Sequence, residues 1–264
     1  MFESTDHTFA ICAYRESPYL QQCIESLINQ SSASSIIMTT STPNQYIEDL
    51  ASRYKIPLYV NDAPLGIASD WNYAYEQAQT ELVTIAHQDD VYCRDYASLA
   101  LSKLNESQKP LILFSDYGEI RNDVRIEKSR LLNIKRLLLS PLKSPSRQSS
   151  VFWRRRVLSL GSAICCPSVT MVKHSLPSPL FREGFDTNLD WDAWERLSCL
   201  EGGFIYNPRI LMYHRIHEES ETSRLIKDNT RSKEDESLFL RFWPRPIAKM
   251  INIVYSQAQK SNTL

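Results

Sequence analysis

The sequence lacks the features that mark membrane-spanning or secreted proteins. Its 264 residues include no apolar run long enough to cross a bilayer, and the first ten residues have no basic segment followed by an apolar one. The six cysteines are scattered, with no CxxC pair. This pattern favours free thiols over a zinc site or a disulfide framework, and we expect a cytoplasmic protein.

A dominant charge of one sign is also missing. Thirty Lys and Arg against 31 Asp and Glu give a formal net charge of −1, so overall charge gives no reason to expect a nucleic-acid partner. The charge is uneven, however: residues 121–160 contain eleven Lys or Arg and only two acidic residues, Asp123 and Glu127. The length predicts one large globular domain or two small ones.

Glycine-rich phosphate loops are absent as well. Neither GxGxxG nor GxxxxGK[ST] occurs, which excludes the usual dinucleotide fingerprint and the P-loop. What is present is an alternation of short apolar runs with amphipathic helical segments, and we expect strands at residues 9–14, 35–40, 57–60 and 82–86. This alternation predicts an α/β fold with a Rossmann-like, mostly parallel central sheet and helices on both faces.

Candidate functional residues cluster where the fourth expected strand ends. The stretch ELVTIAHQDDVY runs from buried apolar residues directly into His87, Asp89 and Asp90. An imidazole and two carboxylates are costly to place at the end of a core strand unless a positive group lies beside them. Mg²⁺ or Mn²⁺ would suit these ligands, and the alternative is an ordinary polar exit from the strand. In parallel sheets ligands bind beyond the carboxyl ends of the strands, so residues 13–15 and 39–41 should face the same crevice.

Three stretches of the chain resemble the nucleotide-sugar half of a family 2 glycosyltransferase of GT-A fold: FAICAYRESPYLQQCIESLINQS, NDAPLGIASDWNYAYEQAQTELVTIAHQDDVY and LILFSDY. The resemblance implies a nucleotide-sugar-binding half at 1–117, an acceptor-binding and catalytic half at 118–217, and a C-terminal loop with a helical tail at 218–264. It further implies an inverting, metal-dependent enzyme that moves a sugar from a nucleotide-diphosphate donor to a hydroxyl of a carbohydrate or lipid-linked acceptor, in polysaccharide or glycolipid assembly.

The resemblance assigns roles around the donor. Asp89 takes the last acidic position of the family's metal-binding motif and is the first choice of Mn²⁺ or Mg²⁺ ligand, while His87 stands at its first acidic position and Asp90 is a further candidate. Thr40 replaces the family's nucleobase-binding Asp, and its hydroxyl can hydrogen-bond a base or ribose. The implied donor-binding residues are Ala13, Tyr14, Arg15, Thr40, Asp70, Asp89 and Arg215.

A second group of candidates lies in FDTNLDWDAWERLSCL, residues 185–200. It resembles the family's acidic motif at the start of a helix, which makes Asp190 the general base that takes the proton of the attacking hydroxyl. Otherwise Asp190 is a carboxylate favoured by the helix dipole, and Asp192 is the alternative base. Trp191 and Trp194 are predicted, with Asp192, to bind the acceptor, although tryptophans in a helix are more often core residues.

The segment YNPRILMYHRIHEESETS, residues 206–223, resembles the family's late Arg–x–His segment. By that resemblance Arg215 neutralises the donor diphosphate and His217 completes the metal site, whereas His214 is a structural histidine.

Two segments, 130–156 and 241–255, are both basic and apolar. Each either lies on the inner face of a membrane or packs on the core with its charges in water. Residues 140–150 and 218–237 are expected to be loops.

Two other functions fit parts of this pattern. A nucleotidyltransferase of similar fold would need a basic, glycine-rich loop near the N-terminus, and CAYRESPY has no glycine. A non-catalytic nucleotide- or carbohydrate-binding relative is suggested by His87 and Thr40, which replace acidic residues. The joint presence of Asp89, Asp190 and the Arg–x–His segment argues against it.

Overall fold

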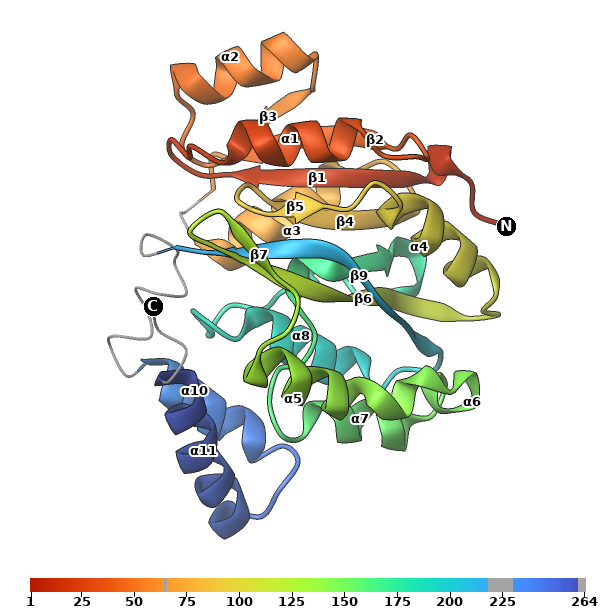
Figure 1. Cartoon of the computed structure of the whole chain (residues 1–264), viewed down its shortest axis with the longest axis vertical. Coiled ribbons are helices and arrows are strands. Elements are labelled where there is room, and N and C mark those ends of the chain that lie inside the picture. The colour runs from red at the N-terminus through yellow and green to blue at the C-terminus, as the bar shows by residue number, and fades with distance from the viewer. Residues whose placement is uncertain (64–65, 218–229, 261–264) are drawn as a thin grey trace.

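The computed structural model describes residues 1–63, 66–217 and 230–260 (Figure 1). Within these residues it is a mixed α/β structure around one curled sheet, whose strand order is β3-β2-β1-β4-β8-β6-β9-β5, with β7 paired to β6.

The first half of the chain has the predicted alternation. Its elements are β1 His7–Ala13, α1 Leu20–Ile28, β2 Ser35–Thr40, α2 Gln45–Tyr54, β3 Leu58–Val60, α3 Ile67–Gln77 and β4 Leu82–His87. The four strands pair in parallel, with Ala13 opposite Thr40 and Cys12 opposite His87. The carboxyl ends of β1, β2 and β4 therefore finish level, at one edge of the sheet.

The second half of the sheet is not parallel throughout. Its strands are β5 Val91–Tyr92, β6 Pro110–Arg121, β7 Val124–Ile126, β8 Val169–Val172 and β9 Gly203–Ile216, with α4 Tyr96–Asn105 between β5 and β6. β8 runs antiparallel to both β4 and β6, whereas β9 runs parallel to β6. Asn122 and Asp123 both have positive φ, as the two-residue turn between β6 and β7 requires. The expected boundary after residue 117 lies inside β6, so the two predicted halves share one sheet.

Helices cover both faces of the sheet. Residues 9 and 11 of β1 pack with α1, α2 and α4, while residue 10 packs with α3 and with the later helices. This alternation is the normal consequence of successive side chains pointing to opposite faces. The later helices are α5 Arg130–Leu139, α6 Pro145–Gln148, α7 Val151–Leu158, α8 Leu189–Leu197, α10 Thr230–Phe239 and α11 Arg245–Lys260.

Two of the expected loops contain helix. Residues 140–150 form the 3-10 helix Ser140–Lys143 and the short helix α6, each with proline in its first turn, where its fixed φ suits a helix. Of the polar segment 218–237, residues 230–237 belong to α10, and residues 218–229 lie outside the described part of the chain. No helix in the described ranges is long and apolar enough to cross a bilayer.

Candidate active site

Gln88 links the end of β4 to the end of β1, two of the three strands whose carboxyl ends lie at the same level. The Tyr14 N–H donates to Oε1 of Gln88 at 2.9 Å, and Nε2 of Gln88 donates to the Tyr14 carbonyl at 3.0 Å. The loop after β1 is thereby fixed against the loop after β4. Gln88 was not among the predicted site residues, although it lies between His87 and Asp89 in the sequence.

Asp70, in the first turn of α3, joins the ends of β2 and β3. Its carboxylate accepts hydrogen bonds from Ser41 Oγ and Asn61 Nδ2, both at 2.9 Å. Asp70 and Ser41 are half-buried, and Asn61 is buried. They lie at the strand ends where a donor is expected. Ser41 belongs to residues 39–41, which were predicted to face the crevice, whereas Asn61 was not among the predicted residues.

Thr40 and Ala13, two of the predicted donor-binding residues, have buried side chains. Thr40 is 2% exposed, and its Oγ1 accepts the N–H of Thr42, which closes the turn after β2. Ala13 is 3% exposed. The structure therefore does not present the Thr40 hydroxyl or the Ala13 side chain to a ligand, whereas Tyr14 is half-buried and Arg15 is exposed.

His87, Asp89 and Asp90 converge as the sequence predicted. Each offers one ligand atom, and these atoms lie within 4.8 Å of one another. Asp89 Oδ2 lies 2.9 Å from His217 Nε2, and Asp90 Oδ1 accepts from His214 Nδ1 and the Arg215 N–H, both at 2.9 Å.

Two buried atoms of this cluster, His87 Nε2 and Asp90 Oδ2, have no hydrogen-bond partner in the structure. Unpaired buried polar atoms are rare and costly, so each needs an explanation. Carboxylate oxygens together with an imidazole nitrogen are a donor set that fits Mn²⁺, and the carboxylates alone suit Mg²⁺. The residues present therefore fit a divalent metal.

Electrostatics keep these groups in the forms that a cation requires. Burial lowers the pKa of His87, against the opposing effect of Asp90 and Asp89, which favours a neutral imidazole with a free lone pair. Burial works against ionisation of Asp89, but the hydrogen bond from His217 and the charge of His214 hold its pKa below the usual value. Burial likewise opposes protonation of His214, yet Asp90 raises its pKa to about 9.

Arg215 does not lie where the prediction needs it. Its side chain is 3% exposed and sits 4.1 Å over the Tyr19 ring. The guanidinium donates to the Asp89 carbonyl, to Asp123 and to Gln22. With all its nitrogens bonded inside the protein, Arg215 braces β9 against the loop after β4 and does not reach out to a diphosphate.

Asp190 lies in the first turn of α8. One of its carboxylate oxygens accepts the Trp191 N–H at 2.7 Å. Burial raises its pKa above the usual value, and the Trp191 N–H and the charges of Arg231 and Lys135 offset only part of that rise. A carboxylate with a raised pKa is suited to accept a proton near neutral pH.

The buried thiols Cys165 and Cys166 are influenced by acidic residues of both regions. Burial raises the pKa of both Cys165 and Cys166 well above the usual value, and both Asp90 and Asp190 raise it further. The two carboxylates therefore act on the same pair of thiols.

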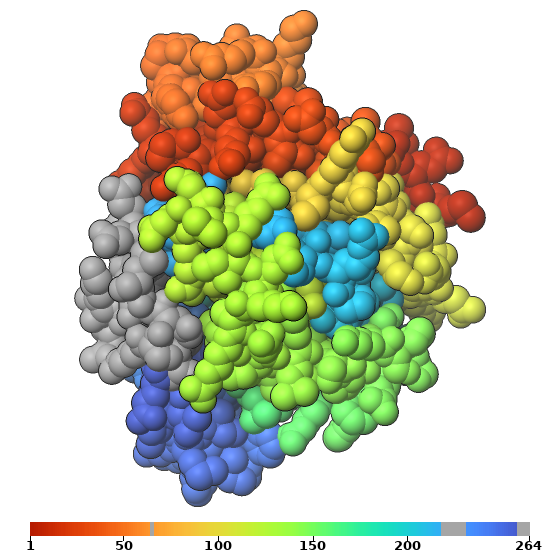
Figure 2. Space-filling view, viewed as in Figure 1, coloured from red at the N-terminus to blue at the C-terminus, as the bar shows by residue number. Residues whose placement is uncertain are grey.

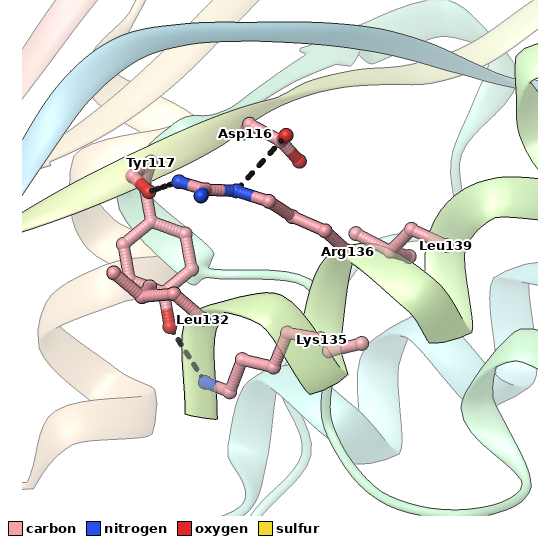
Figure 3. A pocket seen from close by; sticks show the side chains of 7 residues that line it. Asp116, Tyr117, Leu132, Lys135, Arg136 and Leu139 are labelled. Carbon is pink, nitrogen blue, oxygen red and sulfur yellow. Dashed lines mark hydrogen bonds and ion pairs between the residues drawn. The ribbon is translucent and has the colours of Figure 1, made fainter. Parts of the chain in front are cut away.

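Lys135 lies near the same region because α5 is anchored on β6. Its Nζ donates to the Tyr117 hydroxyl at 2.7 Å, while Arg136 pairs with Asp116 at 3.2 Å and donates to the Tyr117 carbonyl (Figure 3). The cavity between these side chains is about 10 Å³, too small for a sugar. In this helix, Lys135 and Arg136 are therefore bonded to the sheet and not spread over a lipid surface.

The predicted acceptor residues Trp191, Asp192 and Trp194 are corrected by their burial. Both tryptophans are 0% exposed, and Trp191 donates its indole N–H to the Leu158 carbonyl. Asp192 is 2% exposed and pairs with Arg196 at 2.9 Å and Arg241 at 2.7 Å. These three residues belong to the buried side of α8, which leaves Asp190 as the better-placed base.

Glu234 of α10 holds the turn that precedes Asp190. Its carboxylate accepts the backbone N–H groups of Asp186, Thr187 and Asn188 at 2.6 to 3.1 Å, and also the Thr187 hydroxyl. The neighbouring Asp235 accepts from Asn188 Nδ2 at 2.9 Å. Unpaired N–H groups at a helix start are commonly satisfied in this way, but nothing local in the sequence indicates a partner 46 residues away.

We expect Glu234→Ala to weaken folding by about 2 kcal/mol, because several hydrogen bonds to one carboxylate are lost. It should also lower kcat by about tenfold through misplacement of Asp190. Melting temperature and steady-state kinetics measure the two effects, and Glu234→Gln should restore part of each. Glu236→Ala, on the same helix, is the matched control. Unchanged kcat in Glu234→Ala would contradict a positioning role.

The chain matches the model of the family described as "Glycosyl transferase family 2" over residues 8–168. No curated protein sequence matches it significantly.

Solved glycosyltransferase structures share its fold. A mannosyltransferase, PcManGT from Pyrobaculum calidifontis, in complex with GDP-Man and Mn²⁺, is 14% identical with a TM-score of 0.63, and the match covers 95% of this chain and 69% of that one. S. aureus TarS 1–349 in complex with UDP-GlcNAc is 13% identical with a TM-score of 0.61, covering 94% and 70%. Against a longer TarS chain, at 12% identity and a TM-score of 0.60, this chain spans 42% of the length. These likenesses show a GT-A fold.

Proposed function

This chain belongs to glycosyl transferase family 2, and we propose that it transfers a sugar from a nucleotide-diphosphate donor to a hydroxyl acceptor, with inversion and with a divalent metal. The observation that carries the proposal is that His87 Nε2 and Asp90 Oδ2 are buried without a hydrogen-bond partner, in a cluster with Asp89 at the carboxyl end of β4. In sheets of this kind, that edge is where ligands bind.

The donor lies across the ends of β1, β2 and β4. The structures of PcManGT with GDP-Man and of TarS with UDP-GlcNAc support a nucleotide-sugar donor. On the side of β2, the half-buried Ser41 and Asp70 replace Thr40 as the groups for ribose or base, because the Thr40 hydroxyl is used by the turn. On the side of β1, the exposed Arg15 follows the strand end, and we assign it to the diphosphate.

His87, Asp89 and Asp90 Oδ2 would hold the metal, and Mn²⁺ in PcManGT supports that choice. When bound, Mn²⁺ or Mg²⁺ would neutralise charge on the leaving diphosphate. His217 keeps Asp89 ionised by donating to it, and His214 with the Arg215 N–H fixes the other oxygen of Asp90.

Asp190 accepts the proton of the acceptor hydroxyl. As that oxygen forms its bond to the anomeric carbon, the bond from this carbon to the diphosphate oxygen breaks, and the electron pair leaves with the nucleoside diphosphate. Attack on the face opposite the leaving group inverts the configuration. We place this reaction in polysaccharide or glycolipid assembly in the cytoplasm, as the family resemblance implies.

A thermal-shift screen of UDP- and GDP-sugars, with and without Mn²⁺, tests donor binding. A ligand at 100 times its Kd stabilises the native state by about 2.7 kcal/mol. For a chain of this size we expect a rise in Tm of about 5–10 °C that requires Mn²⁺. If no nucleotide sugar shifts Tm under either condition, the proposed function is wrong. A shift with a nucleoside triphosphate alone, accompanied by release of pyrophosphate from it, would instead favour a nucleotidyltransferase.

A further inference from the structure

One face of α11 is apolar and exposed. The helix packs on the protein through its opposite face, where Ala248 is fully buried and Tyr255 is half-buried. The outward side chains and their exposed fractions are Ile247 39%, Met250 61%, Ile253 60% and Val254 63%. Residues 247, 250 and 254 follow helical spacing and form one stripe along the helix, with residue 253 beside it. We call these four residues the α11 stripe.

Positive charge accompanies the α11 stripe along the helix itself. Residues 237–264 contain Arg241, Arg245, Lys249 and Lys260 but no Asp or Glu. Arg245 and Lys249 are exposed and lie one helical turn apart, along one edge of the stripe. Arg156 adds a further cation near the start of α11, since its guanidinium lies 4.8 Å over the ring of Trp243.

We infer that α11 docks on an anionic lipid surface, with the α11 stripe among the upper acyl chains and Arg245 and Lys249 at the headgroup phosphates. A helix with an apolar stripe, a basic edge and low overall hydrophobicity is suited to lie in the plane of a membrane interface. An anionic surface complements both features at once. A second copy of the chain would complement only the stripe, because pairing two identical stripes brings the same cations together.

The helix α11 adjoins the helix that carries the candidate base. Tyr255 packs against Trp191, with ring centroids 6.0 Å apart, and against Phe239 of α10. Trp191 directly follows Asp190 in α8. The two C-terminal helices form one end of the molecule (Figures 1 and 2). A membrane bound at this end would present the hydroxyl of a lipid-linked acceptor near Asp190. That role in catalysis rests on the proposed function, whereas the docking of α11 on lipid does not.

Co-sedimentation with vesicles tests the docking. We expect the protein to bind vesicles of phosphatidylcholine with about 30% phosphatidylglycerol and to bind pure phosphatidylcholine much more weakly, with the difference reduced at high salt. The double variant Met250→Glu/Ile253→Glu should lose at least about tenfold in partitioning. Lys249→Glu should lose about tenfold on anionic vesicles only.

A matched control uses apolar residues that are equally exposed elsewhere. Val124 on β7 and Leu137 on α5 are 62% and 71% exposed, so Val124→Glu/Leu137→Glu should bind vesicles as the native chain does. Equal binding by the native chain and the Met250→Glu/Ile253→Glu variant would overturn the inference. The inference would also be overturned if the native chain did not bind vesicles but formed dimers, and if the Met250→Glu/Ile253→Glu variant abolished those dimers. Size-exclusion chromatography detects the dimers.

The donor-induced rise in Tm separates this inference from the proposed function. The crevice at the ends of β1, β2 and β4 does not include α11, so the Met250→Glu/Ile253→Glu variant should keep the full rise with nucleotide sugar and Mn²⁺. Loss of lipid binding with that rise intact supports the docking surface. A native chain that binds anionic vesicles but shows no nucleotide-dependent rise would contradict only the proposed function.

Discussion

Asp190→Asn is expected to lower kcat by about a thousandfold, while the affinity for the nucleotide sugar stays within about twofold. The amide has the size of the carboxylate, and its oxygen can still accept the Trp191 N–H that holds the side chain. It cannot accept the proton of the acceptor hydroxyl. Initial rates at saturating donor, together with the donor-induced rise in Tm, measure the two quantities.

The pH profile gives this prediction a second readout. Asp190 acts as a base only when ionised, and burial raises its pKa above the ordinary value for a carboxyl. Activity of the native chain should therefore fall as the pH drops through this raised pKa, which places the acid limb of kcat/KM higher than an exposed aspartate would. Asp190→Asn should lack that limb. Native rates in this variant would show that another group is the base.

Asp192→Asn is the matched control, since the same substitution is made two residues away on the same helix. Asp192 is 2% exposed and pairs with Arg196 and Arg241. In Asp192→Asn, Arg241 keeps its ion pair with Glu195, but the largely buried Arg196 loses its carboxylate partner, at a cost of up to about 3 kcal/mol. Its main effect should be a lower Tm, with the surviving folded enzyme still turning over. The two variants together separate chemistry from stability.

The parallel half of the fold was predictable because its information is local. Short apolar runs alternate with helical segments in residues 7–87, and parallel pairing then places the strand ends level. The place of the four-residue strand β8 in the sheet could not be predicted in this way. The strand enters antiparallel between β4 and β6, and that pairing depends on contacts more than 50 residues away.

The same difference between local and long-range information applies to the residues of the candidate site. His87, Asp89 and Asp90 follow a buried strand directly, so the sequence located them. Arg215 lies on β9, and in a strand a shift of one residue in register decides whether a side chain faces a ligand or the protein. The pairing of β9 with β6 contains register shifts near Asp116, and no local pattern in the sequence predicts them.

Asp89→Ala should remove the Mn²⁺-dependent part of donor binding. The substitution takes away the ligand that His217 keeps ionised, and of the cluster in the described part of the chain it leaves His87 and one oxygen of Asp90. Loss of an outer partner of a metal ligand already costs 10- to 100-fold in affinity, so we expect more than about a 100-fold weaker affinity for Mn²⁺ in the presence of nucleotide sugar. Isothermal titration with Mn²⁺ measures it.

The controls for Asp89→Ala decide which residue carries the metal. Asp49→Ala removes an exposed carboxylate from α2 and should change nothing. His87→Ala should weaken Mn²⁺ binding less than Asp89→Ala does, because a carboxylate supplies charge as well as an oxygen. If Asp89→Ala still binds donor in a Mn²⁺-dependent way, Asp89 is not the principal ligand. In that case His87 and Asp90, each of which has a buried atom without a hydrogen-bond partner, are the principal ligands within the described cluster.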